Sequence, residues 1–286
     1  MERDLSELLD EWPYEPGKIN VRLIQGADGE PRIQVRVDLG LLQMHAEGRP
    51  DGQTPHGYGS FLEYQEARLD QILQGGPDTP PPGPYAPPDP ELLANPPEPV
   101  ADAPAPLGEG EESPRFLSPE DCRELREEAL QYYHRYVALL VLEDYDGVIR
   151  DTTRNLRVLD LCRDHAREPS DREALEQFRP YILMMRARAL ASQAIKDSEP
   201  KAAIHAIDEG LDALKRHFDE TGRSEELESS REYAALRSMR EALVPKLPVS
   251  QKAELRQRLS EALASENYEL AAILRDELRM LPDEEG

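Results

Sequence analysis

Long apolar runs, cysteine and tryptophan are all scarce in this sequence of 286 residues, which holds two cysteines and one tryptophan. The two cysteines, Cys122 and Cys162, are too few for a disulfide framework. The longest apolar run covers residues 137–142, whereas a helix needs about 20 apolar residues to cross a bilayer. The acidic N-terminal sequence also lacks an apolar signal segment. These absences predict a soluble, cytoplasmic protein without a membrane partner.

A basic segment is missing as well. The formal net charge is −24, and residues 1–117, 118–248 and 249–286 contribute −14, −6 and −4 to it. Proteins that bind nucleic acid non-specifically neutralise phosphates with clustered Lys and Arg side chains. Because no segment is net basic, direct nucleic-acid binding is a poor hypothesis for this chain.

The motifs of common catalytic and metal sites are also absent. The sequence has no glycine-rich loop ending in Gly-Lys-Ser/Thr to bind phosphate, and no CxxC or HExxH pair to bind zinc. Cys162 and His165 are one helical turn apart, but Cys162 shares an apolar stripe with Leu159, which favours a buried cysteine. We therefore predict a non-enzymatic protein with no catalytic residue, no cofactor and no metal.

The only strand pattern lies within residues 1–74. Apolar and polar residues alternate over residues 19–24 and over residues 33–38, on both sides of a Gly-Ala-Asp-Gly turn. This arrangement is typical of a β-hairpin, and residues 39–44 extend it or form a third strand. Residues 61–73 then follow the spacing of a short amphipathic helix. The pattern predicts a small α+β unit.

A loop punctuated by glycine and proline, residues 48–59, precedes that helix. It gathers four side chains that could contact a small molecule or a partner: Arg49, Asp51, His56 and Tyr58. Functional groups concentrate on loops. One hypothesis is therefore that the N-terminal unit is a small-molecule-binding or enzymatic domain, regulated by the helices that follow. Turn formation alone also explains the glycines and prolines, and we favour that interpretation.

Proline dominates the next segment. Residues 75–114 hold 14 of the 26 prolines, and most of the other residues there are Gly, Ala, Asp or Glu. Such a composition buries too little apolar surface to offset the entropy lost on ordering. It predicts an acidic linker over residues 75–116 that is disordered or extended. A role as a proline-motif ligand is an alternative, although such motifs arise by chance in this composition.

Residues 117–247 follow an apolar spacing of 3.6 residues almost throughout. Ser118 and Pro119 supply the cap and first position of a helix, and breaks near residues 143–147 and 167–171 separate successive helices. This pattern predicts a helical domain that is either a bundle or a stack of repeats. Its second half loosely resembles the tetratricopeptide repeat, although the full repeat signature is missing. The residues that carry the resemblance are Ala191, Ala194, Pro200, Ala203, Ile207 and Gly210.

Tyr132, Tyr133 and Tyr136 form the densest aromatic cluster of the chain. At helical spacing, such residues more often belong to a core than to a binding surface. We favour the core interpretation, with a peptide-binding groove as the alternative.

Residues 250–281 have the pattern of a helical hairpin. Two apolar stripes flank a polar turn at residues 264–267, and Leu270 and Ile273 form an additional apolar edge. The stripes face each other in an antiparallel αα-hairpin. A segment shorter than about 40 residues cannot bury a sufficient core alone. We therefore expect the hairpin to pack against a second copy, another protein or the preceding helices.

The run over residues 255–281 resembles the UVR motif, named for the bacterial excision-repair proteins UvrB and UvrC. The single departure is Asn267, where aspartate is commoner. The matching residues are Glu266, Asn267, Tyr268, Glu269, Ala271, Ala272, Leu274, Arg275, Asp276 and Leu278.

The resemblance implies protein–protein contact without catalysis. In the family, this hairpin joins UvrB to UvrC, and it recurs in Clp chaperone subunits and in an activator of an arginine kinase. The present chain is similar to uncharacterised bacterial proteins that attach such a hairpin to a helical body. The resemblance implies a non-catalytic adaptor or scaffold, with an accessory role in nucleotide excision repair as the alternative. The residues expected to bind another protein or a second copy are Leu255, Leu259, Tyr268, Leu270, Ala271, Ala272, Ile273, Leu274, Arg275 and Leu278.

Overall fold

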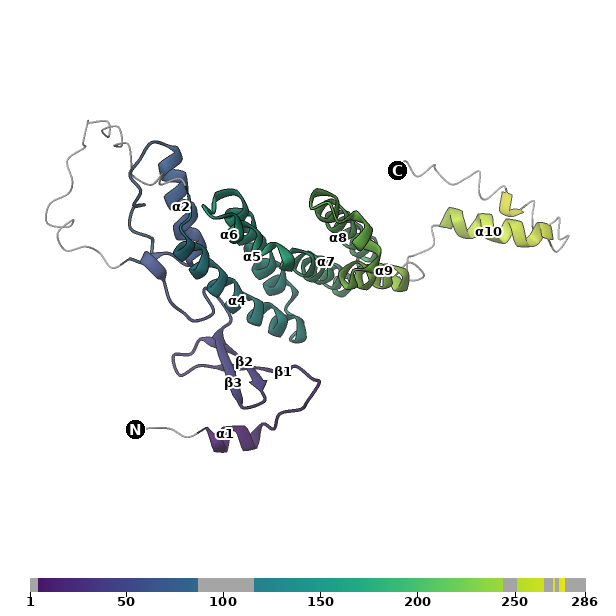
Figure 1. Cartoon of the computed structure of the whole chain (residues 1–286). Coiled ribbons are helices and arrows are strands. Elements are labelled where there is room, and N and C mark those ends of the chain that lie inside the picture. Colours follow the sequence, from purple (N-terminus) through teal and green to yellow (C-terminus); the bar gives the residue numbers. More distant parts are fainter. Residues whose placement is uncertain (1–4, 87–115, 244–250, 265–269, 271–272, 276–286) are drawn as a thin grey trace. The chain divides into compact units, whose positions relative to one another are not determined.

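A computed structural model describes residues 5–86, 116–243, 251–264, 270 and 273–275, without the side chains of residues 251–257 (Figure 1). The chain forms two compact units, Met1–Met239 and Arg240–Gly286. The part of the predicted linker between residues 87 and 115 lies outside the described residues.

A three-stranded antiparallel sheet lies near the N-terminus, after the short helix α1 (Ser6–Glu11). Its strands are β1 (Asn20–Gln25), β2 (Pro31–Val37) and β3 (Gly40–His45), in that order across the sheet. The predicted hairpin is therefore confirmed, and the residues after it form a third strand. The turn between β1 and β2 places Gly29 at a φ of +84°, a conformation that glycine adopts without steric cost.

The two faces of the sheet differ in chemistry. Ile33 of β2 pairs with Met44 of β3, and both side chains are buried. On the other face, polar side chains form a ladder across the three strands. Arg22 donates to Gln34 at 2.8 Å and Gln34 donates to Gln43 at 2.8 Å. The pleat alternates side chains between the faces, so this register places Ile33 and Met44 on one face and the Arg–Gln ladder on the other.

Helix α2 (Phe61–Leu73) follows the loop that contains the 3₁₀ turn η1 (Pro55–Gly57). Ser60 caps α2, since its hydroxyl accepts a hydrogen bond from the backbone N–H of Glu63 at 3.2 Å. The backbone N–H groups of Phe61 and Leu62 donate instead to the carboxylate of Glu128, at 2.7 and 3.2 Å. A carboxylate from another helix thus satisfies two of the unpaired donors that every helix start presents.

The helical part of the first unit is built from long helices connected by short turns. Helix α4 packs on α5, α5 on α7, and α7 on α8 (Figure 1). Helix α4 starts at the predicted cap Ser118, which forms a reciprocal capping box with Asp121. The elements are α4 (Pro119–Val141), α5 (Tyr145–His165), α6 (Pro169–Glu173), η2 (Glu176–Phe178), α7 (Arg179–Lys196), α8 (Pro200–Glu220), η3 (Ser224–Ser229) and the part of α9 (Arg231–Leu243) up to Met239.

Small residues let α7 and α8 approach closely. A Cβ atom added at Gly210 would lie 2.4 Å from the Cβ of Ala187, and Ala191 and Ala203 are fully buried. This packing explains the small side chains on which the tetratricopeptide resemblance depends. The resemblance itself stays a prediction, because close approach of two helices needs small residues in any helical fold.

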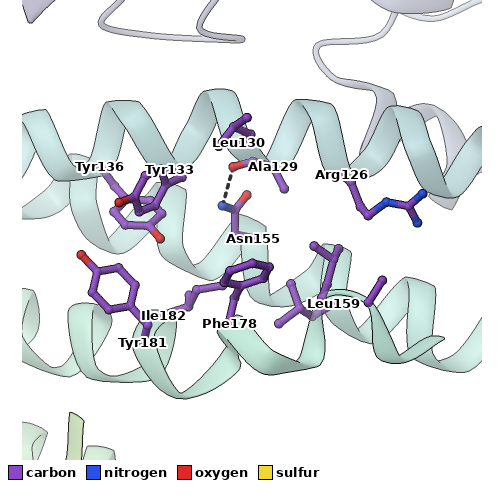
Figure 2. A pocket seen from close by; sticks show the side chains of 12 residues that line it. Arg126, Ala129, Leu130, Tyr133, Tyr136, Asn155, Leu159, Phe178, Tyr181 and Ile182 are labelled. Carbon is purple, nitrogen blue, oxygen red and sulfur yellow. Dashed lines mark hydrogen bonds between the residues drawn. The ribbon is translucent and has the colours of Figure 1, made fainter. Parts of the chain in front are cut away.

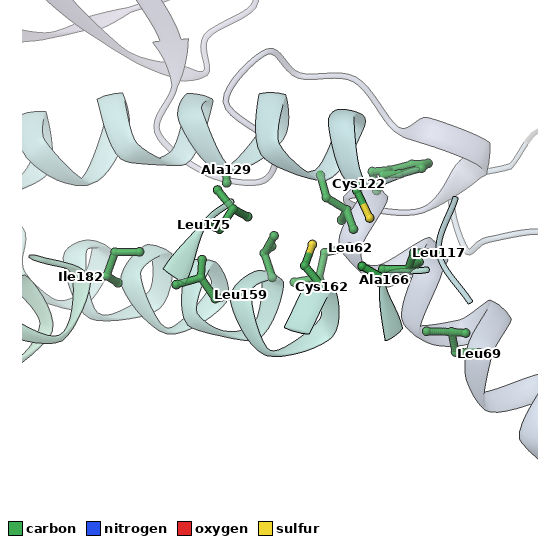
Figure 3. Close-up of a cluster of buried hydrophobic side chains, with 13 residues drawn as sticks. Leu62, Leu69, Leu117, Cys122, Ala129, Leu159, Cys162, Ala166, Leu175 and Ile182 are labelled. Atoms are coloured by element: carbon green, nitrogen blue, oxygen red, sulfur yellow. The ribbon is translucent and has the colours of Figure 1, made fainter. Parts of the chain in front are cut away.

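One apolar core joins α2 to α4 and α5 (Figure 3). Leu62 and Leu69 of α2 are buried together with Leu125 of α4 and Leu159 of α5. Cys122 and Cys162 are free, buried thiols in the same cluster. The sequence pattern predicts separate domains over residues 1–74 and 117–247. The first compact unit, which ends at Met239, contains α2 together with α4 and α5, on which the apolar face of α2 packs.

The fold class predicted from the sequence is confirmed as mainly helical with a small N-terminal sheet. In the second unit, α10 (Gln251–Ala264) forms the first arm of the predicted hairpin. Residues 270 and 273–275 of the predicted second arm are helical, and residues 265–267 of the predicted turn lie outside the described residues.

Candidate functional site

Arg135 fixes the loop after β3 to the helical body. This almost fully buried side chain of α4 makes two hydrogen bonds to Asp151 of α5, with Nε–Oδ2 at 2.7 Å and Nη2–Oδ1 at 2.8 Å. Its Nη1 donates to the backbone carbonyls of Gly48 at 2.7 Å and His45 at 3.2 Å. One guanidinium group therefore neutralises a buried carboxylate and satisfies two loop carbonyls.

Two of the predicted ligand-loop residues, Arg49 and Asp51, also contact α4. The Nε atom of Arg49 lies 3.3 Å from Asp51 Oδ1 and 3.3 Å from Glu128 Oε1. Asp51 accepts hydrogen bonds from the backbone N–H of Gln53 at 2.9 Å and from the side chain of Gln131 at 3.1 Å. Glu128 is fully buried. These contacts attach the loop to the helices.

The other two ligand-loop residues, His56 and Tyr58, turn toward α2 and the start of the proline-rich segment. The His56 ring stacks on Tyr64 with a centroid distance of 4.1 Å, and the Tyr58 hydroxyl donates to the Pro81 carbonyl at 2.8 Å. A Cβ atom added at Gly83 would lie 2.2 Å from the carbonyl oxygen of Gly57. The chain therefore covers its own loop here, and the four predicted residues do not converge on one shared site.

Several of the predicted partner-binding residues can be placed in the second unit. Leu274 is almost fully buried and Leu259 is half-buried, whereas Ile273 is 58% exposed and Leu270 and Arg275 are also exposed. Leu263, on α10, is 52% exposed. The predicted residues Tyr268, Ala271, Ala272 and Leu278, and the side chain of Leu255, lie outside the described part of the chain. The described side chains thus divide into a buried set and an exposed apolar set.

An aromatic groove runs between α4 and the start of α7, over α5 (Figure 2). It has a volume of about 540 Å³. The rings of Tyr133 and Tyr136 meet edge to face at 5.5 Å, and Tyr181 lies 6.2 Å from Tyr133. Its lining residues are Arg126, Ala129, Leu130, Tyr133, Tyr136, Asn155, Leu159, Ala174, Leu175, Phe178, Tyr181 and Ile182.

The three clustered tyrosines, Tyr132, Tyr133 and Tyr136, differ in their exposure to solvent. Tyr132 and Tyr136 are buried, whereas Tyr133 is exposed at the groove. Burial raises the pKa of Tyr136 and of Tyr181 above the ordinary phenol value, and the neighbouring tyrosines act in the same direction. Both phenols therefore stay neutral hydrogen-bond donors at physiological pH. Phe178 and Tyr181 could not be recognised as groove residues from the sequence, because they join Tyr133 only through the packing of α4 and α7.

The described residues show neither a metal-ligand cluster nor a membrane-spanning helix. They contain no group of three or more His, Cys, Asp or Glu side chains that could hold a metal ion. Over the same part of the chain, none of the helices is both long and apolar enough to cross a bilayer.

Comparison with known families identifies one motif. Residues 250–281 match the UvrB/uvrC motif, so the chain carries the UVR motif at the hairpin that contains α10. This motif mediates protein interactions and occurs in DNA-repair proteins. Comparisons with curated proteins and with solved structures gave no match.

Proposed function

We propose that this protein is a non-catalytic adaptor that docks a protein partner through its C-terminal hairpin. The observation that carries the proposal is the match of residues 250–281 to the UvrB/uvrC motif. A motif that mediates protein interactions supplies the binding surface, and the helical first unit supplies a second folded body on the same chain.

The exposure of the hairpin residues supports a docking role. Leu263 and Ile273 expose more than half of their surface, although apolar side chains of this size gain about 1.5–3 kcal/mol when they are fully buried. Ala262 and Leu274 are already buried. The exposed pair is therefore available to a partner surface, while the buried pair stabilises the unit itself.

A pair of charge substitutions tests this division. Ile273→Asp and Leu263→Asp place a carboxylate on the exposed apolar positions, where it should remain solvated and leave the helices folded. Affinity capture from the native host should lose its hairpin-dependent partners with these variants. Ser260→Asp adds the same charge at an exposed polar position of α10 and serves as the matched control.

Circular dichroism of each variant separates loss of docking from loss of folding. Sedimentation of the unaltered chain over a range of concentrations shows whether the captured partner is a second copy. If capture were equal for Ile273→Asp, Leu263→Asp and Ser260→Asp, with all three folded, the docking role of the hairpin would be refuted.

A further inference from the structure

The aromatic groove is unusual in its charge. The chain has a net charge of −24, yet none of the twelve lining residues is acidic and Arg126 is the only charged one. Arg126 uses Nη1 to contact Asp171 at 2.6 Å. Its other N–H groups have no hydrogen-bond partner in the described part of the chain. An acidic ligand would meet no repelling carboxylate among these lining residues.

The groove also offers hydrogen-bond donors without internal partners. The hydroxyls of Tyr133 and Tyr181 have no hydrogen-bond partner among the described residues. Figure 2 shows their rings and that of Tyr136 gathered between α4 and α7. A phenol hydroxyl over an apolar surface donates readily to a carbonyl oxygen. The groove therefore presents donors and apolar rings together.

A proline-rich extended peptide has the complementary chemistry. Its carbonyl groups have no internal hydrogen bonds, its proline residues have no N–H that needs an acceptor, and its rings pack on aromatic side chains. Such a peptide also loses little conformational entropy on binding because its backbone is already restricted. The residue types that line the groove match this class of ligand.

The chain itself contains such a sequence. Residues 87–115 include nine prolines and seven carboxylates but only one basic residue. We propose that the aromatic groove binds this proline-rich segment of the same chain. Rings of the segment contact Leu130, Tyr133 and Phe178, and its carbonyls accept from the tyrosine hydroxyls.

The described ends of the segment make this contact sterically accessible. The last described residue before the segment, Ala86, donates its N–H to the Gly83 carbonyl, and Leu117, just after the segment, is paired with Ala166. The 29 residues of the segment span roughly 90 Å when extended. Arg126 and Tyr136 lie only about 12 and 27 Å along α4 from Ser118. A tether of this length gives an effective concentration in the millimolar range, so weak contacts suffice.

Photo-crosslinking of the full chain tests the proposal. Phe178, which is 52% exposed on the groove, is replaced by p-benzoylphenylalanine, and the crosslinked peptides are identified by mass spectrometry. We expect crosslinks to residues 87–115 in a product with the mass of one chain. The same probe at Leu39, which is 92% exposed in the turn between β2 and β3, measures random encounters. A crosslink yield to the segment no greater than from Leu39, or a product of two chains, would overturn the proposal.

Matched substitutions on α4 test the chemistry of the contact. Leu130→Asp adds a carboxylate at an exposed groove position and should lower the crosslink yield several-fold by repelling the acidic segment. Val141→Asp makes the same change at an exposed position of α4 outside the groove and should leave the yield unchanged. Tyr181→Phe removes only a hydroxyl and should also lower the yield. If Leu130→Asp and Tyr181→Phe both crosslink as well as the unaltered chain, the proposed contact does not exist.

Discussion

The buried carboxylate of Glu128 accepts a hydrogen bond from the backbone N–H of Phe61 at 2.7 Å, which joins α4 to the first residue of α2. The same carboxylate pairs with Arg154 of α5 and lies 3.3 Å from Arg49 in the loop. A single acidic side chain therefore connects three parts of the first unit, which lie far apart in the sequence.

Glu128→Gln should destabilise the protein by about 3 kcal/mol or more, because the change leaves the charge of Arg154 buried without its carboxylate. The amide keeps one acceptor oxygen for Phe61 or Leu62, so the loss combines the broken ion pair with one lost hydrogen bond to α2. Urea unfolding measures the change in the free energy of unfolding. Glu127→Gln alters the adjacent, exposed carboxylate and should cost less than about 1 kcal/mol. Equal losses in the two variants would contradict this account of Glu128.

Arg135→Met should loosen the loop after β3. The substitution leaves the buried Asp151 with only Arg150, 3.0 Å away, and removes the donor to Gly48 and His45. We expect a loss of about 3 kcal/mol, near the lower end for a broken buried pair because Arg150 remains.

Hydrogen exchange locates this effect. The amide of His45, which donates to the Pro50 carbonyl at 2.8 Å, should exchange faster in Arg135→Met than in the unaltered chain. Arg123→Met removes an exposed arginine from the same helix and should leave that amide unchanged. Protection of His45 that is the same in both variants would show that Arg135 does not fix the loop.

Acidification should reduce stability through His217. Burial lowers the pKa of this imidazole below its ordinary value of 6.5, and the charges of Arg179 and Arg223 lower it further, while Glu176 and Glu220 act against them. The unfolded chain therefore takes up the proton first. The contribution of His217 is fully present above pH 6.5 and is lost as the pH falls toward the lowered folded-state pKa.

Thermal unfolding from about pH 7.5 to about pH 5.5 tests whether acidification lowers the stability of the protein through His217. His217→Gln should show a smaller loss of stability on acidification than the unaltered chain. His205→Gln changes a histidine of α8 whose side chain is 75% exposed and should follow the unaltered chain. A steeper loss in His217→Gln would reverse the predicted sign.

Gly210→Ala should destabilise the protein although alanine is the better helix former. The new methyl group would lie 2.4 Å from Ala187 Cβ and 3.0 Å from Leu236 Cδ1. Overpacking of this kind costs about 1–3 kcal/mol, which exceeds the gain of about 1 kcal/mol in helix propensity. Chemical denaturation gives the net change.

A double-mutant cycle separates the close contact from other effects of Gly210→Ala. Ala187→Gly removes the opposing methyl group and should partly rescue the Gly210→Ala variant, which gives a favourable coupling energy. Independent, additive losses would mean that the two residues do not limit the approach of α7 and α8.

Local patterns in the sequence were sufficient for most elements of the fold. The alternation on both sides of the Gly-Ala-Asp-Gly turn predicted β1 and β2, and Ser118 with Pro119 predicted the start of α4. Turns, caps and apolar periodicity act between residues close in the chain, so they can be read without tertiary information. The UVR motif was also recognisable from its sequence alone, as the family match shows.

The placement of these elements required the tertiary structure. The sequence predicted separate domains over residues 1–74 and 117–247, because each stretch has its own periodicity. Phe61 and Glu128 are nevertheless hydrogen-bonded to each other, 67 positions apart in the sequence. Arg49 of the loop, which the sequence offered as a ligand-binding residue, contacts the buried Glu128 of α4. The type of a residue does not show whether its side chain binds a ligand or another part of the same fold.

The aromatic groove could not be predicted from the sequence for the same reason. Tyr133 could be assigned to a helix from its spacing, but whether it faced the core or solvent depended on where α7 brought Tyr181 and Phe178. The sequence by itself determined the helices, the hairpin strands and the UVR motif, because each arises from neighbouring residues. Only the tertiary structure decided which of their faces share a core and which remain open, because that choice depends on packing between residues distant in the chain.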